Sequence, residues 1–168
     1  FPGYGAATMY DNNYQPKPAY NSTVTTLGGS NPPPPPPTGG AIHAVGAGKC
    51  LDVPNSTTTG GTQLQINTCS GGSNQLFTHT SSNALTVYSG STQMCLDANA
   101  KGTTNGTKVI IYTCNGQTNQ QWNVNSNGTI TGVASGLCLD VTGASTANGA
   151  LVELWACNGG SNQQWTIS

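Results

Sequence analysis

The spacing of six cysteines constrains the fold of this chain more than any other feature. They form three pairs whose members lie 19 positions apart: Cys50 and Cys69, Cys95 and Cys114, and Cys138 and Cys157. The first cysteine of every pair begins a Cys-Leu-Asp triplet. A glycine lies eight positions before the second cysteine, and an Asn-Gln pair begins five positions after it. This period of about 43 residues indicates three copies of one structural unit, which fill residues 41–168.

Cysteine usage also predicts the compartment. Equal spacing makes pairing within each repeat the simplest disulfide connectivity, and each closed loop would add roughly 3 kcal/mol in the chain-entropy model. A zinc site would need a cysteine cluster beside His43 or His79, and the sequence has no Cys-x-x-Cys, so no metal or other cofactor is expected. An even cysteine count is typical of an oxidising compartment, so we expect a secreted, extracellular protein.

Composition excludes several classes of partner. The chain has four basic and five acidic residues and a formal net charge of −1, so no basic patch is available for nucleic acid. No apolar run approaches 18 residues, so no membrane span is predicted. Abundant Gly, Ser, Thr and Asn without helical periodicity favour short strands joined by turns, which indicates an all-β fold. A monomer is the default expectation.

A proline run divides the chain. Residues 28–40, GGSNPPPPPPTGG, are typical of a semi-rigid polyproline II linker with flexible ends. A proline-rich ligand for another domain is the alternative. Residues 1–27 hold four tyrosines and no cysteine, whereas residues 41–168 hold all six cysteines and three tryptophans. The sequence therefore predicts a 1–27 segment, a 28–40 linker and a 41–168 module.

Strand periodicity gives each repeat an inner and an outer face. The segments LQINTC, VIIYTC and VELWAC precede the second cysteines, and one of their two faces is uniformly aliphatic, so we expect it to face the core. The other face carries Tyr112 and Trp155 in the second and third repeats. Beside the first cysteines, the same alternation predicts that Asp52, Asp97 and Asp140 point outward.

An outward aromatic ring beside an aspartate favours a shallow site for a neutral ligand rich in hydroxyl groups. The ring face suits the axial C–H groups of a sugar, and the carboxylate accepts hydrogen bonds from two hydroxyls. In the simpler alternatives, the aspartates bond their own turns and Tyr112 and Trp155 are ordinary surface aromatics. The aromatics that close the Asn-Gln stretches are predicted to be core residues: Phe77, Trp122 and Trp165.

The pattern Cys-Leu-Asp, glycine, cysteine and Asn-Gln-x-Trp, three times at this spacing, resembles the ricin B-type lectins and family 13 carbohydrate-binding modules over residues 41–168. The resemblance implies a β-trefoil with four strands per repeat, a six-stranded barrel and a cap of three hairpins. It implies one shallow sugar site per repeat and a non-catalytic binding module. Xylan or xylo-oligosaccharides are the expected ligands, and a galactose-type lectin that binds galactose or lactose is the alternative.

The resemblance also assigns the residues of each site. The first site would be Asp52, Gln65, Asn67 and Asn74; the second Asp97, Ile110, Tyr112 and Asn119; the third Asp140, Glu153, Trp155 and Asn162. Supporting glutamines would be Gln75, Gln120 and Gln163. The third and second sites rank above the first, because Asn67 stands where the family usually has a stacking aromatic. Ile110 and Glu153 stand where a Gln or Asn is common.

The N-terminal segment resembles a second family. FPGYGAATMYDNNYQPKPAYNSTVTTL, residues 1–27, looks like the C-terminal end of the (β/α)8 barrel of family 10 endo-β-1,4-xylanases. The resemblance implies a barrel stump, a linker and a binding module, with the catalytic glutamates upstream and absent. Without the rest of a barrel, residues 1–40 cannot bury enough surface to hold a fold, so they are predicted to be mobile.

Other functions predict different features. Glycoside hydrolysis needs two carboxyl groups roughly 5–9.5 Å apart, for which Asp140 and Glu153 are the only plausible pair, and a shallow site would not raise the pKa of an acid by burial. No catalytic residue is therefore assigned. A protein-binding trefoil, as in inhibitors and cytokines, would lack the tripled motif. A glycosylation sequon at Asn105 is predicted to lie near the rim of the second site.

Overall fold

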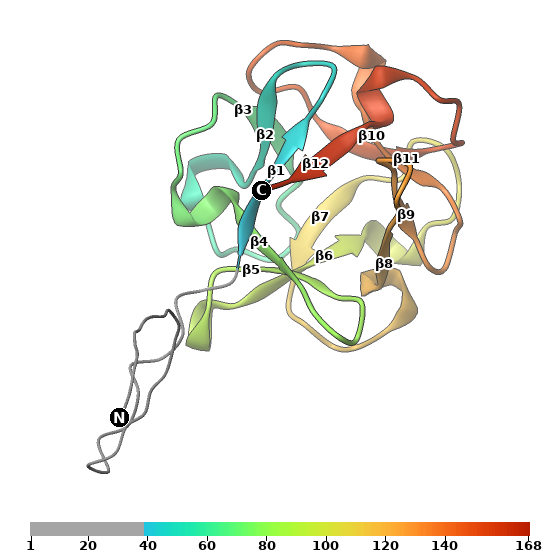
Figure 1. Ribbon diagram of the computed structural model, residues 1–168. Coiled ribbons are helices and arrows are strands. Elements are labelled where there is room, and N and C mark those ends of the chain that lie inside the picture. The colour runs from blue at the N-terminus through green and yellow to red at the C-terminus, as the bar shows by residue number, and fades with distance from the viewer. Residues whose placement is uncertain (1–38) are drawn as a thin grey trace, which may run out of the picture. The chain divides into compact units, whose positions relative to one another are not determined.

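The computed structural model describes residues 39–168, which form twelve short strands connected by turns and single-turn 3-10 helices (Figure 1). The first repeat contributes β1 (Gly40–Ala44), β2 (Lys49–Asp52), β3 (Gln65–Asn67) and β4 (Leu76–His79); the second β5 (Leu85–Val87), β6 (Met94–Ala98), β7 (Val109–Tyr112) and β8 (Trp122–Val124); the third β9 (Ile130–Gly132), β10 (Cys138–Val141), β11 (Val152–Trp155) and β12 (Trp165–Ile167). The prediction of four strands per repeat is confirmed.

Six of the seven 3-10 helices of residues 39–168 follow the same threefold pattern, and η3 has no counterpart in the other repeats. The seven helices are η1 (Pro54–Ser56), η2 (Ser73–Gln75), η3 (Gly90–Thr92), η4 (Asn99–Lys101), η5 (Thr118–Gln120), η6 (Thr142–Ala144) and η7 (Ser161–Gln163). Three of them, η1, η4 and η6, follow the strand that carries the repeat aspartate, and η2, η5 and η7 hold the Asn-Gln pair. None of the helices in this described part is long and apolar enough to cross a membrane.

Six strands close a barrel, as the β-trefoil prediction requires. Antiparallel pairs join β12 to β1, β1 to β4, β4 to β5 and β8 to β9. The bridge between Ala84 and Gln121 links β5 to β8, and the Trp165 amide donates to the Gly128 carbonyl at 2.7 Å to link β12 to β9. The hairpins β2–β3, β6–β7 and β10–β11 form the cap.

The aliphatic faces and the closing aromatics fill one core. All six aliphatic side chains predicted to face inward before the second cysteines are fully buried: Leu64, Ile66, Val109, Ile111, Val152 and Leu154. Phe77, Trp122 and Trp165 are at most 4% exposed, which confirms that they are core residues. The indole nitrogens of Trp122 and Trp165 donate to the carbonyls of Leu96 and Leu139, so each ring is also tied to the strand that bears the repeat aspartate.

The predicted disulfides are all present. Cys50–Cys69, Cys95–Cys114 and Cys138–Cys157 join Cα atoms 5.0–5.1 Å apart. Each bond connects the strand with the aspartate to the loop that leads from the hairpin to the Asn-Gln pair. The nearby imidazole of His43 lies 3.5 Å from Cys50 Sγ, but disulfide sulfurs are not thiolate ligands, so this group does not form a metal site.

The trefoil begins one residue before the predicted boundary at Ala41. Gly40 pairs with Phe77 at the start of β1, and a Cβ at residue 40 would lie 2.1 Å from the Ser168 carbonyl oxygen. Glycine is therefore required where the two ends of the module meet, and the prediction that the chain is mobile up to residue 40 is wrong for Gly40. The predictions for residues 1–27 and for the proline run concern residues outside the described range.

Two tryptophans of the third repeat provide a test of this core. Trp165→Ala should lower the free energy of unfolding by about 3–5 kcal/mol, because it removes a buried indole and its hydrogen bond. Trp155→Ala, in which the lost ring is 41% exposed, should change it by about 1 kcal/mol or less. Urea titrations followed by circular dichroism would measure both. Equal destabilisation of the two variants would contradict the assignment of Trp165 to the core.

Candidate functional site

A buried aspartate accepts a hydrogen bond from a buried glutamine in every repeat. Nε2 of Gln75, Gln120 and Gln163 donates to Oδ2 of Asp52, Asp97 and Asp140 at 2.8, 2.9 and 2.8 Å. The same nitrogens donate to the carbonyls of Thr68, Thr113 and Ala156. The glutamine Oε1 accepts from the backbone amide just after the second cysteine, in Ser70, Asn115 and Asn158. One glutamine side chain thus binds the aspartate and the backbone groups directly before and after the second cysteine.

The aspartates do not point into solvent as predicted. Asp52, Asp97 and Asp140 are only 3–4% exposed. They do lie on the face of their strands opposite the aliphatic core, as the alternation required, but the Asn-Gln turn of the same repeat folds over them. Strand periodicity assigns a side to a residue and contains no information about a turn some 20 positions away that covers that side.

The residue directly opposite each aspartate on the neighbouring strand differs among the repeats. Asp52 pairs with Gln65, Asp97 with Ile110 and Asp140 with Glu153. Gln65 donates to Asp52 Oδ1 at 2.9 Å, so both carboxylate oxygens of the first repeat already have protein donors. The Ile110 side chain has no hydrogen-bond donor. The Glu153 carboxylate is itself an acceptor, and it accepts a hydrogen bond from the Thr142 hydroxyl at 2.5 Å. The second and third aspartates therefore keep an acceptor for a ligand hydroxyl.

Burial also changes the acidity of two of these groups. It raises the pKa of Asp97 above the ordinary aspartate value, while the hydrogen bond from Gln120 partly opposes the rise. Burial likewise raises the pKa of Asp140, and the negative charge of Glu153 raises it further. The expectation that these sites are too shallow to raise a carboxyl pKa is wrong, because the Asn-Gln turn removes water from one side of each carboxylate.

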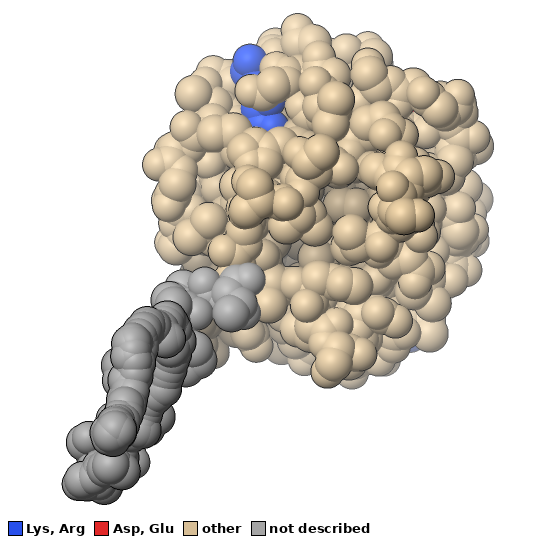
Figure 2. All heavy atoms as spheres, in the orientation of Figure 1, with Lys and Arg blue, Asp and Glu red and all other residues tan. Residues whose placement is uncertain are grey.

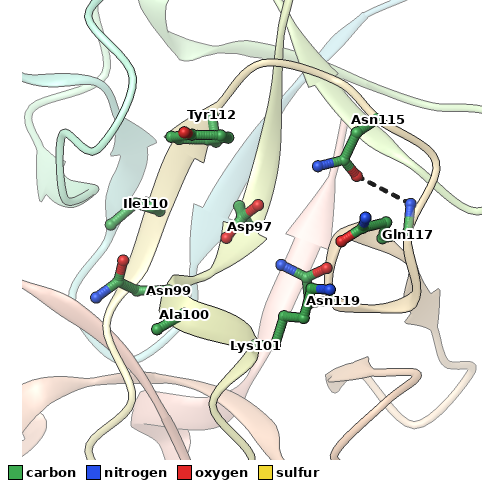
Figure 3. Close-up of a pocket in the computed structure, with 9 residues that line it drawn as sticks. All are labelled: Asp97, Asn99, Ala100, Lys101, Ile110, Tyr112, Asn115, Gln117 and Asn119. Atoms are coloured by element: carbon green, nitrogen blue, oxygen red, sulfur yellow. Dashed lines mark hydrogen bonds between the residues drawn. The ribbon is translucent and has the colours of Figure 1, made fainter.

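The second repeat forms a cavity of about 320 Å³ around Asp97 (Figure 3). Ile110, Tyr112 and Asn119 line it, so the structure brings together all four residues predicted for this site. Tyr112 is 47% exposed, which confirms its outward placement. In contrast, Ile110 and Asn119 are buried, so they shape the cavity floor and are not part of its rim.

The third repeat forms a cavity of about 480 Å³ with the same arrangement. Asp140, Glu153, Trp155 and Asn162 all line it, as predicted. Asn162 donates through Nδ2 to Asp140 Oδ2 at 3.1 Å, and Trp155 is 41% exposed beside them. An exposed indole face next to hydrogen-bonding groups fits the chemistry of a sugar ring, which has an apolar face and a polar edge.

The first repeat brings its four predicted residues into the equivalent positions, but their side chains are used in hydrogen bonds within the protein. Asn74 donates a hydrogen bond to Asp52 Oδ2 at 3.0 Å, and Gln65 donates one to Asp52 Oδ1. Asn67, which is opposite Cys50 on the neighbouring strand, bonds the amide of Thr68 through its own side chain. This repeat offers no aromatic face, and both oxygens of its carboxylate already have protein donors.

The sequence did not identify the turn that closes each cavity on the far side of the aspartate. Asn99, Ala100 and Lys101 line the second cavity from η4, and Thr142, Gly143 and Ala144 line the third from η6. The last two residues of each turn have φ between 53° and 65°, a left-handed conformation in every case. Only their constant distance from the Cys-Leu-Asp triplet, two to four positions after its aspartate, marked them in the sequence.

Each hairpin also supports the site strand of another repeat. The turn-glycine amides of Gly61, Gly106 and Gly149 donate to the carbonyls of Ile111, Leu154 and Ile66, each directly before the site residue Tyr112, Trp155 or Asn67. Asn105 accepts a hydrogen bond from the Ala156 amide at 2.8 Å. This sequon residue, which was predicted to lie near the rim of the second site, therefore contacts the third repeat next to Trp155 and is not among the residues that line the second cavity.

The face shown in Figure 2 is almost entirely uncharged, in keeping with the four basic and five acidic residues of the chain. A barrel of six strands, threefold hairpins and repeated cavities that combine an exposed ring with amide and carboxylate groups defines a carbohydrate-binding β-trefoil. A model of the ricin-type β-trefoil lectin domain matches residues 38–165. The chain belongs to this family, whose domains are non-catalytic carbohydrate-binding modules.

Solved structures agree with this assignment. ThreeFoil, a designed threefold symmetric protein, is 32% identical with a TM-score of 0.68, over 77% of this chain and 96% of that one. An exo-β-1,3-galactanase from Clostridium thermocellum is 25% identical with a TM-score of 0.68, over 79% of this chain and 30% of that one. The agglutinin of Abrus precatorius is 26% identical with a TM-score of 0.67, over 77% and 47%.

Replacing one glutamine tests what holds the second site together. Gln120→Met should lower the free energy of unfolding by about 2–4 kcal/mol at neutral pH, because it leaves a buried carboxylate and two backbone groups without partners. The loss should shrink in acid, where Asp97 is protonated and no longer needs the donor. Gln121→Met is the control, since its amide makes a single exposed hydrogen bond, with Gly116. Equal stability of the two variants would contradict the role given to Gln120.

Proposed function

We propose that this domain binds xylan and xylo-oligosaccharides and holds a parent endo-1,4-β-xylanase at plant cell-wall polysaccharide. The proposal of sugar binding rests on two cavities. In each of them an exposed aromatic ring, Tyr112 or Trp155, lies beside an aspartate whose Oδ1 can accept a hydrogen bond from a ligand. The resemblance of residues 1–27 to the end of a family 10 xylanase barrel supports xylan as the polymer. Three disulfides support secretion, which a cell-wall target would require.

The proposed binding mode follows from the chemistry of each cavity. A xylose ring lays its C–H face on the Tyr112 or Trp155 ring, and its hydroxyls donate to the aspartate. Such a shallow site should bind one sugar with a dissociation constant near 1 mM, or about −4 kcal/mol. Two sites that engage one polymer chain can raise the avidity by roughly 10²–10⁴. The domain therefore favours an insoluble polymer over a free monosaccharide.

A galactose-type lectin is the alternative. The galactanase and the Abrus agglutinin are each 25–26% identical to this chain, and such relatives use the same kind of trefoil. Galactose and xylose differ in the groups at C4 and C5, so the sites separate them through hydroxyl positions and not through the aromatic ring. Galactan is therefore included beside xylan in the experiment that tests the proposal.

Pull-down on insoluble xylan, cellulose and galactan tests both the ligand and the residues. The native domain should partition onto xylan most strongly. Tyr112→Ala and Trp155→Ala should each weaken binding severalfold, and the double variant should lose about tenfold or more, because it removes both stacking rings. Val124→Ala, an exposed apolar residue that lines neither cavity, is the control. Unchanged xylan binding in the double variant would disprove the site assignment, and preference for galactan would favour the alternative.

The raised aspartate pKa values predict how binding depends on pH. A carboxylate accepts two hydroxyls only when it is ionised, and protonation of Asp97 and Asp140 begins at a higher pH than for an ordinary aspartate. Affinity for xylo-oligosaccharides should therefore be constant near neutral pH and fall on acidification before pH about 4, the ordinary aspartate range. Isothermal titration calorimetry, with circular dichroism to show that the fold persists, measures this. Constant affinity down to that range would show that the carboxylates do not contact the ligand.

A further inference from the structure

The second cavity contains a cation that its counterparts lack. Lys101 lines this cavity together with Asp97 and Tyr112, whereas the equivalent position four residues after the aspartate is Ser56 in the first repeat and Ala144 in the third. Lys101 adopts a left-handed φ of 59° at the end of η4, a conformation in which side chains are disfavoured. The Gly102 amide closes this turn by donating to the Asn99 carbonyl at 3.0 Å, and the exposed Lys101 side chain lines the cavity.

We propose that the second site selects sugars that carry an anionic group, such as the carboxylate of a uronic acid, and that Lys101 is the residue that selects them. This inference rests on the proposed function, because it assigns a ligand class to one of the proposed sugar sites. With this assignment, the sites of the three repeats differ in the sugars that they select as well as in their affinity.

The arrangement of the cavity fits a ligand with two different ends. Tyr112 and Lys101 lie on opposite sides of Asp97 in Figure 3. A hexuronic acid has hydroxyls on its C2–C3 edge and a carboxylate attached to C5, on the other side of the ring. Its hydroxyl edge can donate to Asp97 while its carboxylate meets the Lys101 ammonium, so the two like-charged carboxylates stay apart.

A second difference shows that this site is not a copy of the third. Asn74 and Asn162 donate to their aspartates, and each lies against a glycine: a Cβ at Gly72 or Gly160 would come within 2.7 or 2.6 Å of the asparagine Oδ1. The second repeat has Gln117 at that position.

Gln117 has a Cβ where Gly72 and Gly160 have none, and Asn119 differs from its counterparts in one bond. Its Nδ2 donates to the Ala98 carbonyl at 3.3 Å, as Asn74 and Asn162 donate to the carbonyls of Val53 and Val141. The additional bond that Asn74 and Asn162 make to the aspartate Oδ2 has no counterpart at Asn119. Asn119 is 7% exposed, and its Oδ1 has no hydrogen-bond partner among residues 39–168. An unpaired buried acceptor beside the cavity is costly on its own, and a hydroxyl or ammonium donor that approaches it on ligand binding would relieve that cost.

The third site has the opposite electrostatic character. Glu153 is opposite Asp140 on the neighbouring strand, and no basic residue lines that cavity. Two carboxylates repel an anionic sugar, whereas in the second cavity the charges of Asp97 and Lys101 cancel. An acidic sugar should therefore enter the second site and avoid the third.

The test compares sugars that differ in one group. In a Trp155→Ala background, which disables the third site, NMR titration should show methyl β-D-glucuronide binding about two- to fivefold tighter than methyl β-D-glucoside at low salt. The preference should disappear at high salt and in Lys101→Gln, and it should persist in Lys49→Gln, a lysine outside both cavities. Shifts should concentrate at Tyr112 and Asn119. Glucose 6-sulfate distinguishes a general anion site from one that fits a carboxylate.

The outcomes separate this inference from the proposed function. Binding of xylo-oligosaccharides without any preference for the glucuronide, or a preference that survives in Lys101→Gln, overturns the inference and leaves the proposed function intact. Failure of all neutral and acidic sugars to bind the native domain overturns both. Equal gains for the sulfate and the glucuronide support a site for anionic sugars of either kind.

Discussion

The hydrogen bond from a buried glutamine to a buried aspartate is the interaction on which the rest of each repeat depends. It brings the Asn-Gln turn onto the strand that follows the first cysteine, while the disulfide joins the same two segments from the other end. A hydrogen bond to a charged group contributes about 1.5–3 kcal/mol, and more is lost when the buried carboxylate has no donor. The aspartate therefore has two roles, since Oδ2 holds the fold and Oδ1 is left to meet a ligand in the second and third repeats.

The sites are not independent units, because each rests on another repeat. The turn glycines donate in a cycle, from the first repeat to the second, from the second to the third and from the third to the first. Gly60 packs so closely on Tyr112 that a Cβ there would lie 3.2 Å from the ring. A single repeat would lack the hairpin that positions its own aromatic residue, which explains physically why the unit occurs in threes.

The sequence predicted the parts of this structure that depend on period and spacing. The disulfides, the buried Phe77, Trp122 and Trp165, and the exposed Tyr112 and Trp155 follow from repeated positions and from strand alternation. It failed where a distant segment changes an environment. The burial of Asp97 depends on a turn that closes over it, and the contact of Asn105 with Ala156 depends on the threefold arrangement. The part played by η4 was missed because its residues differ in every repeat.

The three repeats share a constant framework and differ at the positions around each aspartate, which affects how the domain would bind a polymer. The core positions and the Asp–Gln hydrogen bond are the same in all three repeats, so the aspartate of each repeat is held in the same geometry. The residues opposite the aspartate and at the end of the following turn differ freely: Gln65, Ile110 and Glu153, then Ser56, Lys101 and Ala144. None of these side chains belongs to the central hydrophobic cluster, so their substitution can change what a site accepts without repacking that cluster. A polysaccharide with neutral and acidic residues along one chain would then engage different repeats through different sugars, and the avidity would depend on its substitution pattern as well as on its length.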